Sequence, residues 1–161
     1  MAGLGGVLSK LLELAGASYV CVVERDSARI LGDVGGNDGH AVDINSVIAL
    51  ATSAAEIADA PGEGPVEDLI LSSRRCYHVL RPVDVPAGPT LLLYIRLQRG
   101  RATLALARRE LGTAEIQRAV LDLARGRSDR GDVSAAARDT GAAAAAAPAP
   151  ATSPAAVPPR A

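Results

Sequence analysis

The stretch TLLLYIRLQR, residues 90–99, carries the strongest indication of how this chain folds. Side chains alternate between the two faces of a β-strand, so every second residue shares a face. The residues that share one face of this stretch are all aliphatic: Leu91, Leu93, Ile95 and Leu97. The segment that follows, ATLALARREL at 102–111, is helical in character. We therefore expect a well-buried strand that leads directly into a helix.

Outward from this stretch, the remaining apolar runs predict a sheet with helices on both of its faces. Residues 18–24 form a continuous apolar run with β-branched residues, as expected for a central strand. The aliphatic residues of 4–15 recur every three or four positions, which predicts a helix that Gly16 is well placed to end. The expected elements are a helix at 4–15, strands at 18–24 and 29–34, a helix at 43–59, strands at 66–72, 76–83 and 90–99, and helical segments at 102–111 and 114–125. We predict an α/β chain of the α+β type, with an antiparallel five-stranded sheet and the order α-β-β-α-β-β-β-α.

The last part of the chain differs in composition from the rest. From Gly126 onward charged and small residues are followed by poly-alanine and then by several prolines. Such a segment has nothing large to bury. We predict one domain over 1–125 and a disordered Ala/Pro-rich tail over 126–161.

Composition and charge argue against several function classes. The net charge is −1, so no overall field attracts nucleic acid or an anionic membrane, and the only aromatic residues are three tyrosines. The longest aliphatic run, 91–95, is far shorter than a membrane span. No secretory signal is recognisable at the N-terminus, so a cytoplasmic protein is expected. Cys21 and Cys76 are too few for a disulfide framework and are interpreted as small buried hydrophobes.

No catalytic or metal-binding motif emerges from the sequence. The glycines near Ser9 and Lys10 lack the spacing of a phosphate-binding loop. His40, beside Asp38 and Asp43, is a weak metal candidate, and solvated loop residues are the better interpretation. The other histidine, His78, shares a strand face with Cys76, but no orienting third group is evident. We expect a non-enzymatic protein without cofactor or metal, and leave open whether Cys21, Cys76 or His78 has a role beyond packing.

The helix expected at 43–59 is unusually apolar. Asp43 is a natural N-cap for it. Behind this cap lie two adjacent apolar stripes, the first formed by Ile44, Val47, Ile48, Ala51, Ala55 and Ala58 and the second by Leu50, Ala54 and Ile57. One contact with a sheet needs less apolar surface than this, so the helix is predicted to contact a further protein surface.

Several of these segments together resemble the Roadblock/dynein light-chain family. The resemblance rests on the opening amphipathic helix, on GASYV at 16–20, on ILGD at 30–33 and on the long second helix. Its most specific part is LLYIRL at 92–97, which continues into ATLALARREL at 102–111. This last block is similar to bacterial members, particularly those of actinobacteria.

The resemblance implies a homodimer that pairs through the second helix and the third strand. Glu67 and Asp68 lie in that expected edge strand, whose exposed hydrogen-bonding groups strand pairing would cover. The implied interface residues are Ile44, Val47, Leu50, Ala51, Ala54, Ile57, Glu67, Leu69 and Leu71. Family members commonly regulate or scaffold small Ras-like GTPases without hydrolysing GTP themselves.

Two alternatives stay open. One is an assembly adaptor without a GTPase partner. The other is a profilin-like small-ligand sensor with a pocket lined by Tyr19, Tyr77, Tyr94 or His78.

Overall fold

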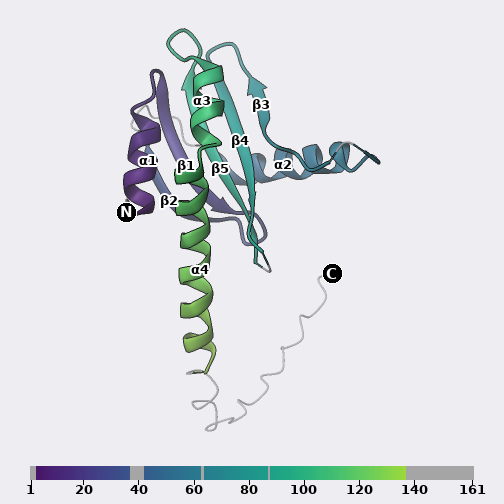
Figure 1. The fold of residues 1–161 in the computed structure, drawn as a ribbon. Coiled ribbons are helices and arrows are strands. Elements are labelled where there is room, and N and C mark those ends of the chain that lie inside the picture. The colour runs from purple at the N-terminus through teal and green to yellow at the C-terminus, as the bar shows by residue number, and fades with distance from the viewer. Residues whose placement is uncertain (1–2, 37–41, 63, 87, 137–161) are drawn as a thin grey trace, which may run out of the picture.

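The computed structural model describes residues 3–36, 42–62, 64–86 and 88–136. Its centre is an open five-stranded antiparallel sheet with the strand order β2-β1-β5-β4-β3 (Figure 1). The strands are β1 (Ala17–Glu24), β2 (Arg29–Gly35), β3 (Leu69–Ser72), β4 (Cys76–Asp84) and β5 (Thr90–Gln98). The helices are α1 (Leu4–Leu12), α2 (Ile44–Ala58), α3 (Leu104–Leu111) and α4 (Ala114–Ala136). The predicted α+β class, sheet and element order are confirmed.

β5 lies at the middle of the sheet, and its sequence explains this position. Its residues from Leu91 to Leu97 are all buried, because helices cover both faces of the strand. One set of alternate side chains packs beneath α1, α3 and α4, and the other set packs beneath α2. A strand apolar at nearly every position is stable only where both of its faces are covered.

The face beneath α1, α3 and α4 holds the larger core, which we call the closed face. It includes Leu8 and Leu11 from α1, Leu111 from α3, and Ile116 and Val120 from α4. α1 ends at Leu12, three residues before its predicted end. The chain then turns at Gly16, whose φ of +81° and close approach to Ala102 suit a residue without a side chain.

α4 is longer than predicted. The expected helix at 114–125 continues to Ala136, and Figure 1 shows it passing well beyond the end of the sheet. No proline occurs between Ala114 and Pro148, so nothing of that kind in the sequence forces the helix to end at 125. The expected domain boundary at 125–126 therefore falls inside α4. The rest of the expected tail, 137–161, lies outside the described residues.

β3 is shorter than predicted. The expected strand at 66–72 is observed only from Leu69 to Ser72, so the prediction is wrong for residues 66–68. Pro65 just before them lacks a backbone N–H, and Asp68 is held by arginines of other elements. Glu67 is thus outside the strand and exposed.

Candidate functional site

The candidate site is the face of the sheet that α2 crosses, which we call the open face. Asp43 caps the start of α2 as predicted, and its carboxylate accepts hydrogen bonds from the Asn45 N–H at 3.1 Å and the Ser46 hydroxyl at 2.6 Å. The Ser46 hydrogen bond contributes most to lowering the pKa of Asp43. This cap fixes where the helix begins and which of its sides faces the sheet.

α2 buries few of its own residues. Only Val47 and Ala51, each 8% exposed, are buried by the rest of the described chain. They pack on Tyr19, Leu80 and Tyr94 together with other buried residues of the central strands. A surface helix of a folded domain normally buries a whole stripe of apolar side chains against the core of that domain. α2 is therefore covered on one narrow side only.

A groove runs between α2 and the edge of the sheet formed by β3 and β4. It has a volume of about 450 Å³, and its lining is mainly apolar. Its apolar walls are formed by Val47, Leu50, Leu71, Leu80 and Tyr94. Leu71 is 46% exposed in β3, and Ile57, further along α2, is 79% exposed. Exposed aliphatic side chains that lie together beside a groove, unlike single scattered ones, are a feature of interaction surfaces.

The predicted interface residues fall into three groups. Val47 and Ala51 belong to the chain's own core, and Ile44 and Leu69 are half-buried against it. Leu50 and Ala54 are half-buried, while Ile57 and Leu71 are exposed. Glu67, outside β3, is exposed in the segment that leads into the strand. The surface available to a partner thus consists mainly of Leu50, Ala54, Ile57 and Leu71.

His78 is a half-buried polar residue that lines this groove. Its Nδ1 lies 2.8 Å from the Tyr94 hydroxyl, so these two side chains share a hydrogen bond. Burial, with a smaller contribution from the charge of Arg96, lowers the pKa of His78 below its usual range. Burial also raises the pKa of Tyr94. At neutral pH the pair is uncharged, which suits an apolar groove.

The other residues of the expected ligand pocket do not converge on this groove. Tyr19 is buried and donates a hydrogen bond from its hydroxyl to Asp33 at 3.2 Å. Tyr77 packs with the core of the closed face and lies under the guanidinium of Arg99. Cys21 is fully buried, and burial raises the pKa of its thiol to about 12, so its reactive thiolate form is suppressed.

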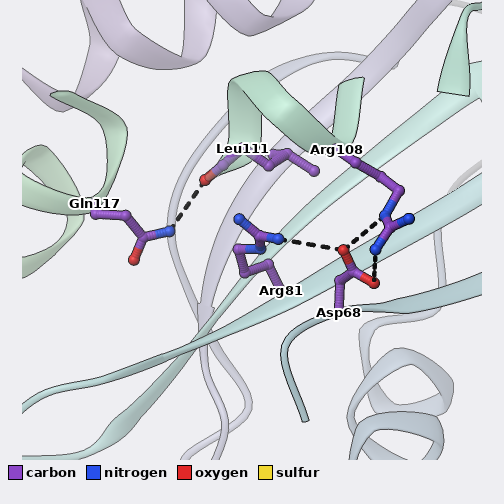
Figure 2. Close-up of polar contacts among 5 residues, drawn as sticks. All are labelled: Asp68, Arg81, Arg108, Leu111 and Gln117. Atoms are coloured by element: carbon purple, nitrogen blue, oxygen red, sulfur yellow. Dashed lines mark hydrogen bonds and ion pairs between the residues drawn. The ribbon is translucent and has the colours of Figure 1, made fainter. Parts of the chain in front are cut away.

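An ionic cluster on the closed face holds the segment that enters β3 (Figure 2). Asp68 accepts hydrogen bonds from Arg108 Nε at 2.8 Å and Nη2 at 3.2 Å, and from Arg81 Nη2 at 3.2 Å. The same view shows Gln117 donating to the Leu111 carbonyl at 3.0 Å, which joins α4 to the end of α3. No local sequence pattern points to this cluster, because its members are far apart in the chain and a helical arginine such as Arg108 is more often a solvated residue.

The described residues offer no group of three or more His, Cys, Asp or Glu side chains arranged to hold a metal ion. His40 and Asp38 lie outside them. None of the helices in the described part of the chain is long and apolar enough to cross a membrane.

Comparison with solved structures identifies the fold. The chain resembles an MglB described as having a tetrameric arrangement, with a TM-score of 0.60 and 17% identity over 76% of this chain and 88% of that one. It resembles the gliding protein MglB of Thermus thermophilus with a TM-score of 0.61 and 16% identity, over 76% and 89% of the two chains. A Roadblock/LC7 domain from Streptomyces avermitilis gives 0.52 and 15%, over 74% and 95%.

These likenesses show that the chain has the Roadblock fold, as its sequence predicted. No protein-family model and no curated protein matches the sequence. The predicted place in the actinobacterial branch stays a prediction.

Proposed function

We propose that this chain is a non-enzymatic regulatory or scaffold protein that forms a homodimer through α2 and β3 and binds a small Ras-like GTPase. The observation that carries the dimer is the uncovered apolar surface of the open face. Leu50 and Leu71 line one groove and Ile57 lies further along α2, and burying them would contribute about 25 cal/mol for each Å² removed from water. A second α2 helix would bring apolar side chains of the same kind to that groove.

The position of β3 supports the same interface. β3 is the last strand of the sheet and pairs only with β4 in the described part of the chain. An edge strand has unpaired N–H and C=O groups that pair readily with an equivalent strand. A twofold axis beside β3 would let each copy cover the other's edge and groove at once.

The dimer is tested by light scattering with paired variants. Ile57→Asp/Leu71→Asp places charges on the proposed interface, and Ile30→Asp is the control, because Ile30 is the exposed aliphatic residue of the opposite edge strand, β2. We expect a dimer for the wild type and for the control, and a monomer for the double variant. A wild-type protein that stays monomeric at high micromolar concentration would refute the interface.

The GTPase partner rests on the Roadblock fold and the sequence resemblance. Its test uses purified small Ras-like GTPases from the same organism, loaded with GDP or with a non-hydrolysable GTP analogue. Binding of the wild type in one nucleotide state is expected. If the chain binds the GTPases in neither nucleotide state, the proposal of a GTPase partner is refuted, while the proposal of a dimer is unaffected. A lack of intrinsic hydrolysis by this chain alone would agree with a non-enzymatic role.

The groove also favours a second candidate, a small-ligand sensor. It combines apolar walls with the hydrogen-bonded pair of His78 and Tyr94, and sites for small molecules commonly have this composition. A ligand in this groove would compete with the dimer partner. A compound that raises the melting temperature and converts the dimer to monomer would favour the sensor.

A further inference from the structure

Four arginines gather at one end of the sheet, away from the proposed dimer groove for the most part. Arg74 and Arg75 form the tip of the β3–β4 turn, and Arg99 and Arg101 lie in the turn after β5. The two turns are neighbours, since Cys76 at the start of β4 is opposite Gln98 at the end of β5. Figure 1 shows both turns protruding at the same end of the molecule. We call these four residues the arginine end.

The arginine end is a fixed arrangement of the backbone and of Arg99. The Arg99 N–H donates to the Arg75 carbonyl at 2.9 Å, and Arg99 Nη1 donates to the Ser73 carbonyl at 3.2 Å. The Arg99 guanidinium lies 5.5 Å from the centre of the Tyr77 ring, within reach of a cation–π contact. The two turns therefore present their charges together on one protrusion.

Acidic residues of the described chain do not neutralise this end. None of the four arginines forms an ion pair with another described residue. Asp43 borders the groove that Arg75 also lines, but its carboxylate caps α2. The charge of Glu13, at the end of α1, interacts with Lys10 and helps to raise the pKa of Lys10. The arginine end thus keeps its positive charge in a chain whose net charge is −1.

The opposite end of the same sheet is hollow and acidic. A groove of about 480 Å³ lies between the C-terminal half of α2, the segment that follows it, and the ends of β4 and β5. Asp59 and Asp84 lie on its border, and Glu56 borders the adjoining hollow. All three carboxylates are exposed and have no ion pair within the described residues. Arg25 also lines the groove, paired with Asp26 at 3.3 Å. We call this the acidic groove.

We propose that the arginine end of one copy docks into the acidic groove of a second copy, head to tail. The two surfaces are complementary: one is a protruding turn with positive charges, and the other is a hollow with carboxylates on its border. A second copy fits better than a long polyanion. Nucleic acid or an anionic membrane extends past the arginine end and meets the rest of a chain with net negative charge.

This contact is compatible with the proposed dimer, on which it does not depend. Leu50 and Ser46 face the dimer groove, whereas Ile48, Ala55 and Asp59 line the hollows on the other side of α2. At about 100° per residue these two sets lie on opposite flanks of the helix. A head-to-tail contact joins unlike surfaces and therefore extends into a ring or an open chain of molecules.

Exposed ion pairs are individually weak, so several must act together and the contact must be sensitive to salt. The Debye length falls from about 10 Å at about 0.1 M salt to about 3 Å at about 1 M. An apolar dimer interface is not weakened in this way. Salt therefore separates the two kinds of association.

The test is sedimentation velocity of the full chain at high concentration, at about 0.1 M and about 1 M NaCl. Arg74→Glu/Arg101→Glu reverses two of the four charges of the arginine end and so cancels its net charge, and Asp59→Arg/Asp84→Arg reverses the charges of the acidic groove. The matched control is Arg118→Glu/Arg125→Glu, which makes the same charge change on exposed positions of α4. In an equimolar mixture the unchanged arginine end of the second variant meets the unchanged acidic groove of the first, which restores one wild-type junction for each pair of copies.

We expect the wild type and the control to form larger species at low salt that disappear at high salt. Each end variant alone should lose them, and the mixture should again form salt-sensitive pairs of the two variants. A sedimentation coefficient that does not change with salt, or end variants that behave like the control, would overturn the proposal. If each variant loses the larger species and the mixture does not associate again, the proposal is also overturned, because the arginines would then not act by pairing with the acidic groove.

The outcome for the head-to-tail contact is distinct from that for the dimer. A dimer that is constant at both salt concentrations supports the α2–β3 interface and refutes the head-to-tail contact. A monomer at high salt that assembles at low salt refutes the dimer and supports the contact.

Discussion

The two faces of the sheet differ in how completely the chain covers them. On the closed face three helices bury a continuous aliphatic core, and Ile116 of α4 has no exposed surface. On the open face a single helix buries two of its residues, and Ile57 of α2 is largely exposed. The same residue type thus has opposite surroundings on the two faces. The closed face holds the folded chain together, and the open face leaves apolar side chains uncovered.

The largest predicted effect tests the closed face. Ile116→Ala leaves a cavity in a packed core, so we expect a loss of about 2–5 kcal/mol in the free energy of unfolding. Urea denaturation followed by circular dichroism measures it. A loss below about 1 kcal/mol would mean that α4 is not firmly packed on the sheet.

A smaller loss is expected from the ionic cluster between α3 and the segment before β3. Asp68→Asn keeps the shape of the side chain but removes the charge that pairs with Arg81 and Arg108, whose guanidiniums lie 3.2 and 2.8 Å from it. Because the Asp68 side chain is nearly buried, we expect a loss of about 1–3 kcal/mol by the same measurement.

Asp122→Asn is the control for this substitution, because Asp122 pairs with Arg125 at 3.7 Å and both side chains are exposed to solvent. An exposed pair contributes little, so its loss should stay within about 0.5 kcal/mol. Equal effects of the two substitutions would contradict the role of Asp68 as an anchor.

The counterpart on the open face is Ile57→Ala. It makes the same chemical change as Ile116→Ala, yet it removes a side chain that the single chain does not bury. We expect a change within about 0.5 kcal/mol at protein concentrations too low for association. At high concentration the variant should lose the stabilisation that the wild type gains from dimerisation. A large loss that is independent of concentration would show that Ile57 belongs to the fold.

The smallest effect concerns pH. The pKa of His78 is lowered in the folded chain, so the unfolded chain takes up a proton first as the pH falls through about 6.5. The contribution of neutral His78 is thus present above that pH and is lost progressively below it. His78→Phe should have a shallower decline in denaturation midpoint than the wild type between about pH 7.5 and pH 5.5. Parallel declines would assign the pH dependence to other groups.

Local sequence patterns are enough for most of the fold. The apolar run at 90–99 and the turn residues at Gly16 and Asp43 act on their immediate neighbours, so their effects can be predicted from spacing alone. The same holds for the excess apolar surface of α2, of which Ile57 is the clearest instance. The predicted start of β3 is wrong, because Asp68 is held by Arg81 and Arg108, which no local pattern connects to it.

The candidate site can be predicted only in part. Helical periodicity groups Val47, Leu50, Ala51 and Ile57 together, but it does not say which of them the sheet covers. That depends on how α2 crosses the strands, which is set by packing against β1, β4 and β5.

Periodicity and turn chemistry suffice for the class of fold, the element order and the presence of a helix with too much apolar surface. Which flank of that helix stays open is a property of the folded chain. Folding also brings Leu50 and Leu71 to the lining of one groove, and it sets the arginines of two separate turns at one end of the sheet, opposite Asp59 and Asp84. The physical reason is that such neighbours are created by strand pairing and helix packing over long separations in the chain, which no local pattern encodes.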